Sequence, residues 1–260
     1  MRTVEHVAET SLRLHEAIAA YTPASFASSF GAEDMVVLDL LHRLELDVDV
    51  FTLDTGRLPQ ETHDLIAVAR ARYGRPIRLQ SPDAEELEEF VAAHGSNAFY
   101  DSIELRKRCC EIRKLVPLRR ALQGKRLWIT GLRREQSVTR ADVAVLAQDA
   151  ANGLMKLNPL ADWSEQEVWA YVEKFDVPTN RLHRLGYPSI GCAPCTRAVQ
   201  PGEDPRAGRW WWEQPTSREC GLHVDPQGRL VRIGASATRT GLERAREPGQ
   251  GEQHQGEQHQ

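Results

Sequence analysis

The fold is decided by one stretch early in the chain, Ala24-Ser25-Phe26-Ala27-Ser28-Ser29-Phe30-Gly31-Ala32-Glu33-Asp34. Its first five residues form a short run typical of a buried strand, and residues 29–32 favour a turn. The apolar spacing that follows predicts a helix over residues 33–44. A strand that passes through a turn directly into a helix is the first half of a parallel βαβ unit.

Strands and helices continue to alternate downstream of this stretch. Residues 48–53 predict a second strand, residues 59–73 a helix that stops at Gly74, and residues 76–79 a third strand. The units recur at roughly 25-residue intervals, which is the pattern of parallel βαβ units. We therefore expect an α/β fold with a doubly wound, mostly parallel sheet.

Local signals predict the remaining elements. Ser81 is expected to act as an N-cap with Pro82 at the first helical position, and Ser164-Glu165-Gln166-Glu167 is a capping box that opens another helix. The other expected elements are a leading amphipathic helix over residues 4–20, a central strand over 127–131, and a small antiparallel extension from 144–146 and 154–157. From Pro178 onward the periodicity fades into Pro- and Gly-rich loops, and long irregular stretches of this kind are usually functional.

Composition narrows the class of protein. At 260 residues the chain can bury one sizeable core, and 33 Lys+Arg against 37 Asp+Glu give a formal charge of -4. This balance gives no indication of nucleic-acid or membrane binding. No run approaches the ~18 apolar residues of a spanning helix, and the N-terminus lacks the features of a signal peptide. We expect a cytoplasmic protein.

Four of the five cysteines form two pairs, Cys109-Cys110 and Cys192-Ala193-Pro194-Cys195. The second pair alone fits zinc, iron–sulfur or redox-disulfide chemistry. Adjacent cysteines are awkward ligands for one small tetrahedral ion, whereas in a cubane cluster each can bind a different iron. We therefore predict a [4Fe-4S] cluster, with a structural zinc site as the alternative.

The first cysteine pair lies in a basic run, with five cations and one acid over residues 106–114. Such a run can be an ordinary solvated surface. Beside a thiolate cluster, the same cations would lower the negative field and could hold an anionic substrate. On a helix, Lys114 would lie over the face that carries Cys109 and Cys110.

Two strand ends outline a nucleotide pocket. The turn at residues 28–34 precedes a helix N-terminus, where backbone N–H groups attract phosphate. Leu53-Asp54-Thr55-Gly56 ends the next strand, at the edge where open α/β sheets bind ligands. Two acids, Glu33 and Asp34, would repel a polyphosphate in the absence of metal.

The fifth cysteine lies apart in Glu219-Cys220-Gly221-Leu222-His223. A nearby protonated His lowers a thiol pKa and so favours the nucleophilic thiolate, which makes Cys220 and His223 candidate catalytic residues. The alternative is a cysteine that merely packs.

Taken jointly, these motifs closely resemble those of assimilatory adenosine 5′-phosphosulfate (APS) reductases. The resemblance runs from about residue 24 to 223 and includes Cys109-Cys110, Lys114, Cys192-Ala193-Pro194-Cys195-Thr196-Arg197, Arg206-Ala207-Gly208-Arg209-Trp210-Trp211-Trp212-Glu213 and the Cys220 motif. It implies an adenine-nucleotide α-hydrolase-like fold, related to ATP pyrophosphatases, and reduction of APS to sulfite and AMP with thioredoxin or glutaredoxin as the reductant.

The resemblance also implies a role for each matching residue. Cys109, Cys110, Cys192 and Cys195 would hold the cluster, and Cys220 would be the nucleophile. Substrate binding would fall to Ser28, Leu53, Thr55, Lys114, Gly131, Arg140, Arg206 and Arg209. The chain departs from some relatives in a loop over residues 131–140 that is one residue shorter, and in a repeated Gly-Glu-Gln-His-Gln tail.

The expected mechanism determines the domain organisation. The Cys220 thiolate attacks the substrate sulfur and forms a cysteine S-sulfonate, and an external dithiol then releases sulfite. Cys220 must swing out to meet that partner, so we expect a nucleotide- and cluster-binding domain over residues 1–212 and a mobile segment over 213–240. Residues 241–260 read as a disordered polar tail, and the tryptophan run that ends at Trp212 is expected to pack on the body. A homo-oligomer is possible.

Three alternative functions remain open. A reductase of 3′-phospho-APS (PAPS), or a dual-substrate enzyme, would share the fold and the Cys220 motif, although PAPS reductases typically lack the four cluster cysteines. An ATP-dependent thiolase would need the polyphosphate turn of true pyrophosphatases, from which residues 29–34 differ. A zinc-binding interaction module would be no enzyme at all.

Overall fold

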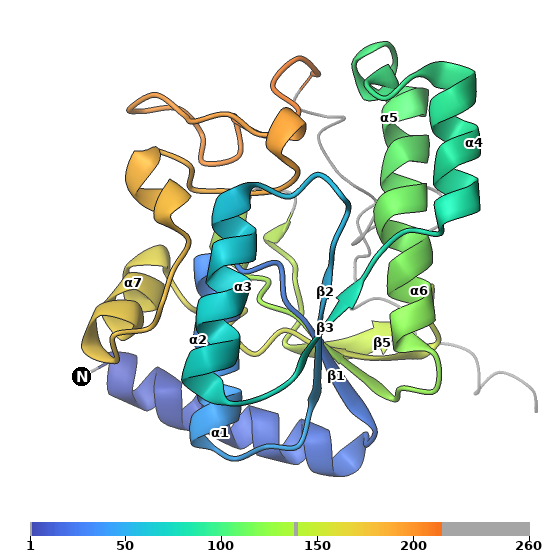
Figure 1. The fold of residues 1–260 in the computed structure, drawn as a ribbon. Coiled ribbons are helices and arrows are strands. Elements are labelled where there is room, and N and C mark those ends of the chain that lie inside the picture. The colour runs from blue at the N-terminus through green and yellow to red at the C-terminus, as the bar shows by residue number, and fades with distance from the viewer. Residues whose placement is uncertain (1, 138–139, 215–260) are drawn as a thin grey trace, which may run out of the picture.

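The computed structural model describes residues 2–137 and 140–214, and it contains one six-stranded sheet in the order β3-β2-β1-β4-β6-β5 (Figure 1). Neighbouring strands pair in parallel except β5, which is antiparallel to β6. The strands are β1 (Ala24–Ala27), β2 (Asp49–Leu53), β3 (Ile77–Gln80), β4 (Leu127–Ile129), β5 (Leu146–Asp149) and β6 (Leu154–Leu157). The predicted mostly parallel sheet is confirmed, and so is its small antiparallel extension, although the first strand of the extension lies at 146–149 rather than 144–146.

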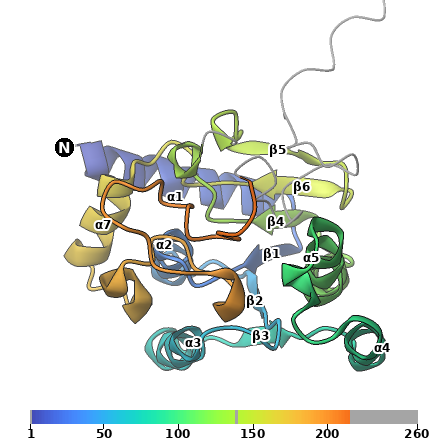
Figure 2. The same cartoon turned by 90° about the horizontal axis from the view of Figure 1, so that it is seen from above.

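Helices cover both faces of the sheet, as a doubly wound fold requires. In Figure 2, α1, α2, α3 and α7 lie on one side and α4 and α5 on the other. The helices are α1 (Arg2–Ala20), α2 (Ala32–Arg43), α3 (Gln60–Tyr73), α4 (Ala84–His94), α5 (Ile103–Cys110), α6 (Val116–Leu122) and α7 (Glu165–Lys174). A π-helical turn, Glu111–Leu115, joins α5 to α6.

Each face of the sheet has its own apolar core. Phe26, Val50 and Ile129 pack with the inward faces of α2, α3 and α7, whereas Phe51 and Trp128 pack under α6. Successive strand residues point to opposite faces, so strands buried on both sides read as continuous apolar runs. This is why the short runs in the sequence identified them.

The strand order places the functional end of the sheet. The chain runs outward from β1 through β2 to β3, then crosses to the other side of β1 to form β4. Ligands of open α/β sheets bind at the carboxyl ends of the strands where this reversal occurs. Here that point lies between Ser28, which follows β1, and Thr130 and Gly131, which follow β4.

One predicted helix start is wrong and another is confirmed. The N-cap of α4 is Asp83 rather than Ser81, because the Asp83 side chain accepts a hydrogen bond from the Glu86 N–H. Pro82 therefore precedes the helix instead of opening it. The capping box of α7 is present, with Ser164 and Glu167 each bonding the other's backbone N–H.

After α7 the described chain crosses over the carboxyl end of the sheet with little regular structure, as Figure 1 shows in orange. Its regular pieces are the short 3₁₀ turns Arg181–Leu185 and Ala193–Cys195 and a bridge between Thr196 and Arg209. The predicted irregular stretch is thus confirmed, and it forms a cover over the point where ligands of such sheets bind.

The tryptophan run packs only in part as expected. Trp210 is fully buried and Trp212 packs beside the buried cysteines, but Trp211 is 46% exposed. Glu213, expected to open the mobile segment, is buried as well. The expectations for Cys220, His223 and the tail lie outside the described residues. Over residues 2–137 and 140–214, no helix is both long and apolar enough to span a membrane.

Candidate active site

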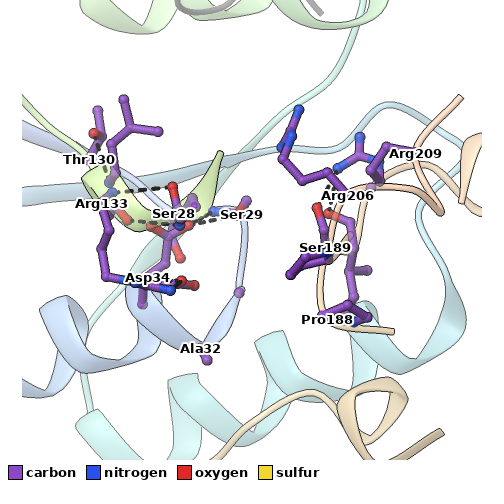
Figure 3. Close-up of a pocket in the computed structure, with 18 of the residues that line it drawn as sticks. Ser28, Ser29, Ala32, Asp34, Thr130, Arg133, Pro188, Ser189, Arg206 and Arg209 are labelled. Atoms are coloured by element: carbon purple, nitrogen blue, oxygen red, sulfur yellow. Dashed lines mark hydrogen bonds and ion pairs between the residues drawn. The ribbon is translucent and has the colours of Figure 1, made fainter. Parts of the chain in front are cut away.

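A cavity of about 630 Å³ opens at the carboxyl ends of β1, β2 and β4. Its volume is in the range typical of small-molecule sites. The eight residues predicted to bind substrate all line it: Ser28, Leu53, Thr55, Lys114, Gly131, Arg140, Arg206 and Arg209. Figure 3 shows two walls facing each other, with Ser28, Ser29 and Arg133 in one and Ser189, Arg206 and Arg209 in the other.

In the turn after β1, the Asp34 carboxylate accepts hydrogen bonds from Ser29. Ser29 donates a hydrogen bond from Oγ to Asp34 Oδ2 over 2.7 Å, and its backbone N–H bonds the same oxygen. A Cβ on Gly131 would lie 2.2 Å from Asp34 Oδ1. Only glycine at this position therefore allows the chain after β4 to approach Asp34 so closely. Burial raises the pKa of Asp34 to about 6, although hydrogen bonds from Ser29 and Gly131 oppose the shift. The donors of Ser29 are thus already engaged.

Arg133 is a site residue that the sequence reasoning did not single out. Its guanidinium pairs with Glu33, with Nε 3.0 Å and Nη2 2.9 Å from Oε1. The pair spans the switch point, because Glu33 begins α2 and Arg133 follows β4. Arg140 lies nearby and is buried, with Nη1 bonded to Gln136 Oε1.

The opposite wall supplies a second arginine cluster. Arg209 Nη1 lies 3.3 Å from Ser189 Oγ and from the Ile190 carbonyl oxygen. The guanidinium fits there because residue 191 is glycine. A Cβ added at that position would lie 2.2 Å from Arg209 Nη2. Arg206 lies one turn earlier, since the Arg209 N–H bonds the Arg206 carbonyl oxygen. Two guanidinium groups at one wall suit an anionic ligand.

The four paired cysteines come together beside this cavity. All are buried and none forms a disulfide. Cys109 and Cys110 end α5, Cys192 and Cys195 flank a 3₁₀ turn, and all four line one small second cavity. Within the described residues, no three His, Cys, Asp or Glu side chains are close enough to hold one metal ion. The structure thus shows four thiols in the wall of one small cavity.

Two residues lie in the walls of both cavities. Cys192 and Lys114 line the large cavity as well as the small one. The Lys114 Nζ also lies 5.9 Å from the ring centroid of Trp210, and its positive charge acts on Cys192 and Cys195. The prediction that Lys114 faces the cysteines is confirmed.

The thiols differ in their electrostatics. Burial raises the pKa of Cys195 to about 12, and the nearby Cys192 adds to this shift. Burial likewise raises the pKa of Cys109. Burial acts in the same direction on Cys192, but the charge of Lys114 and a hydrogen bond from Thr55 outweigh it, so the Cys192 pKa lies below its usual value. Of these three thiols, the one that also lines the substrate cavity is the one whose pKa is lowered.

The basic run around the cysteines is not an ordinary solvated surface. Arg106, Arg113 and Lys114 are buried, and only Lys107 and Arg108 face solvent. Arg113 Nη1 donates to the Thr55 carbonyl oxygen over 2.6 Å. The sequence could have indicated these arginines only as members of a charge run, because their burial depends on partners elsewhere in the chain.

The residues present fit an iron–sulfur cluster. Four thiols can ligate such a cluster, and the buried Arg106, Arg113 and Lys114 beside them would offset its net negative charge. The buried Arg113 Nε lacks a hydrogen-bond partner within the described residues, and so does Trp210 Nε1, which belongs to the same packed group as the cysteines. Such N–H groups are suited to hydrogen bonds with cluster or cysteine sulfur.

A doubly wound sheet with this cavity at its switch point defines a nucleotide-binding protein of the adenine-nucleotide α-hydrolase-like class. Residues 23–198 match the family described as phosphoadenosine phosphosulfate reductase domain, and the chain belongs to that family. It is accordingly an oxidoreductase that acts on sulfur, as the sequence predicted.

Several curated relatives are named adenosine 5′-phosphosulfate reductase. The chain is 57% identical over 198 residues to the one from Allochromatium vinosum, which covers 76% of this chain and 77% of that protein. It is 55% identical to the Burkholderia cepacia protein over 76% of this chain and 80% of that one. A Neisseria meningitidis serogroup A protein is 48% identical over 85% and 94%.

Solved structures give the same fold. A PAPS reductase from Candida auris, in complex with phosphate, superposes with a TM-score of 0.64 and 28% identity, covering 74% of this chain and 90% of that one. FMN adenylyltransferase from Candida glabrata, in complex with FAD and inorganic pyrophosphate, has a TM-score of 0.56 and 15% identity over 90% and 79% of the two chains. At that identity the likeness shows the fold alone.

Proposed function

We propose that this chain reduces APS to sulfite and AMP through an S-sulfonate on Cys220. One observation carries the proposal: a single cavity contains all eight predicted substrate residues and shares Lys114 and Cys192 with the four-thiol site. The names of the curated relatives favour the same substrate.

The first half-reaction joins the Cys220 sulfur to the sulfonate sulfur. As that S–S bond forms, the bond from sulfur to the phosphate oxygen breaks, and its electron pair leaves with AMP. Lys114, Arg206 and Arg209 would neutralise the charge that builds on the leaving phosphate and the sulfonate oxygens. Each preorganised contact of this kind can supply about 2–4 kcal/mol of transition-state stabilisation.

The second half-reaction needs a protein dithiol. A thiolate of thioredoxin or glutaredoxin would attack Cys220 Sγ, and sulfite would leave with the electron pair of the S–S bond. The reductant's second thiol would then resolve the mixed disulfide and regenerate Cys220. In this scheme His223 keeps the Cys220 thiol ionised, and the reaction takes place in the cytoplasm, where such dithiols are reduced.

The four buried cysteines would hold a [4Fe-4S] cluster. The adjacent pair Cys109-Cys110 supports this over a single zinc ion, because neighbouring cysteines are awkward ligands for one small tetrahedral ion. When bound, the cluster would supply structural and electrostatic support for this wall of the cavity. Both electrons come from the dithiol, so the chain's own residues carry the chemistry: Lys114 and the arginines hold the anion, and Cys220 attacks.

Asp34 favours APS over PAPS as the substrate. A second phosphate near the turn after β1 would meet the buried carboxylate of Asp34 and the partly exposed carboxylate of Glu33, with the Ser29 donors already occupied. A PAPS or dual-substrate reductase remains the second candidate because it would use the same arginine wall. The same closed turn speaks against ATP cleavage.

The proposal is tested by product analysis with anaerobically purified protein. APS plus reduced thioredoxin should yield sulfite and AMP in equal amounts, PAPS should compete weakly, and ATP should yield no pyrophosphate. The protein should be brown, with about four irons per chain. Preferential turnover of PAPS would favour the second candidate, whereas a colourless zinc protein that forms no sulfite would overturn the proposal.

A further inference from the structure

Arg106 and Glu213 form an ion pair that is buried on both sides. Arg106 Nε donates to Glu213 Oε1 and Nη2 to Oε2, each over 2.8 Å, and the two side chains are 0% and 3% exposed. Such bidentate pairs fix geometry as well as charge. They are stable in a protein interior only where both partners are held in place.

The two residues lie far apart in the sequence, one on α5 and the other shortly before Cys220. Arg106 lies on α5, three positions before Cys109, and its charge is coupled to that of Cys110. Glu213 lies at the end of the described chain, seven positions before Cys220. The pair therefore joins the helix that carries two of the four buried thiols to the base of the segment that carries the candidate nucleophile.

Trp210 extends this link to the substrate cavity. The Arg106 Cζ lies 5.1 Å from the Trp210 ring centroid, the Arg209 Cζ 4.7 Å and the Lys114 Nζ 5.9 Å. The Glu213 N–H bonds the Trp210 carbonyl oxygen over 2.8 Å, and Trp210 itself adopts a left-handed φ of 44°. The left-handed turn at Trp210 and the ion pair together fix the course of the described chain as far as Glu213.

We propose that the Arg106–Glu213 pair is a positioning clasp that sets where and in which direction the Cys220 segment leaves the body, so that its thiol reaches the bound sulfonate. The inference rests on the proposed function. Neither residue is placed against the substrate; both act through the chain that follows Glu213.

Tether length sets the scale of the effect. Seven residues span at most about 25 Å, so a fixed Glu213 sets an upper limit on the distance that the Cys220 thiol can reach from it. If the clasp opened, the next buried anchor would be Trp210, ten positions before Cys220. That longer tether alone would lower the local thiol concentration by roughly twofold. A larger loss would come from the lost exit direction, which is the proposed role.

The test compares wild-type protein with Glu213→Gln, which keeps the side-chain size and removes the charge. Glu203→Gln is the matched control, because Glu203 forms a similar bidentate pair with Arg197 on the same loop, but exposed. The measurements are iron content, AMP affinity, the single-turnover rate of Cys220 sulfonation by APS, and the rate of Cys220 alkylation by iodoacetamide with and without AMP.

We expect Glu213→Gln to keep its iron and its AMP affinity within twofold, and to be sulfonated more than threefold more slowly than wild type and Glu203→Gln. A rate within threefold of wild type overturns the clasp. So does a parallel loss of iron or AMP binding, which would mark the pair as fold-stabilising only.

The alkylation measurement separates this inference from the proposed function. If wild-type Cys220 gains no sulfonate, the proposed function fails, but the alkylation rate still reports whether the thiol reaches the cavity. We expect AMP to change that rate in wild type and in Glu203→Gln, and not in Glu213→Gln. An equal AMP effect in all three proteins, or none in wild type, overturns the clasp.

Discussion

Thr55 Oγ1 lies 3.2 Å from Cys192 Sγ, and this contact joins the nucleotide cavity to the four-thiol site. Thr55 follows β2 at the functional end of the sheet, and its own carbonyl oxygen accepts from Arg113. One residue thus contacts both a cavity-lining thiol and a buried cation of the basic run. The large cavity and the four-thiol site therefore share a wall.

Replacing Thr55 by Val should weaken the cluster site without unfolding the protein. The isosteric change removes the hydroxyl beside Cys192, and a hydrogen bond to a charged group contributes about 1.5–3 kcal/mol. Loss of brown colour in the presence of an iron chelator should be at least several-fold faster than in wild type. Thr55→Ser, which keeps the hydroxyl, is the control, and equal rates in Val and Ser variants would contradict the assignment.

The two kinds of cysteine should separate cleanly by mutation. Cys195→Ser should lose colour and sulfite formation together, because the thiol lines the small cavity. Cys220→Ser should keep its colour and bind AMP as wild type does, yet form no sulfite. Absorbance, AMP binding and sulfite release measure the three properties. Turnover by Cys220→Ser would show that the nucleophile is misassigned.

Gly191→Ala should impair substrate binding through Arg209. The new Cβ would lie 2.2 Å from Arg209 Nη2 and push the guanidinium out of its place beside Ser189. We expect KM for APS to rise about tenfold or more, the scale of one lost charge-assisted contact. Ser189→Ala, which removes one 3.3 Å contact and adds no atom, should raise KM less. Equal effects in the two variants would count against this geometry.

Asp34 should make stability depend on pH. The folded-state pKa is raised from 3.8 to about 6, so the folded protein retains a proton that the unfolded chain releases between these values. The free energy of unfolding of wild type should therefore fall as pH rises from about 4 to 6, by up to about 3 kcal/mol relative to Asp34→Asn. Well above pH 6, where Asp34 is ionised in both states, the difference should be constant. Urea unfolding of both proteins at several pH values measures it, and a rise with pH would have the wrong sign.

The sequence was sufficient wherever the signal was local. The capping box at Ser164 and the apolar strand runs were read correctly because a few neighbouring residues determine them. Four of the predicted substrate residues, Ser28, Leu53, Thr55 and Gly131, converged in one cavity because the carboxyl ends of parallel strands meet at one edge. Ser81 and Asp83 were confused because both can cap a helix, and only the bond to the Glu86 N–H distinguishes them.

The burial of charged side chains could not be predicted from local sequence signals. Arg106 looked like any member of a basic run, and its burial depends on Glu213, which is 107 residues away in the sequence. The exposure of Trp211 between two packed tryptophans follows from the strained turn at Trp210 rather than from composition. The sequence also did not indicate that Asp34 accepts the hydrogen bonds of its own turn. That arrangement depends on the close approach of Gly131, which follows β4.

The central claim, that Cys220 accepts the sulfonyl group while the paired cysteines do not, is tested most directly by mass spectrometry. Anaerobically purified protein is incubated with APS in the absence of any thiol reductant, digested and mapped. We expect one sulfonate adduct per chain, located on Cys220, with release of one equivalent of AMP. An unmodified chain, or an adduct on another residue, would contradict the account.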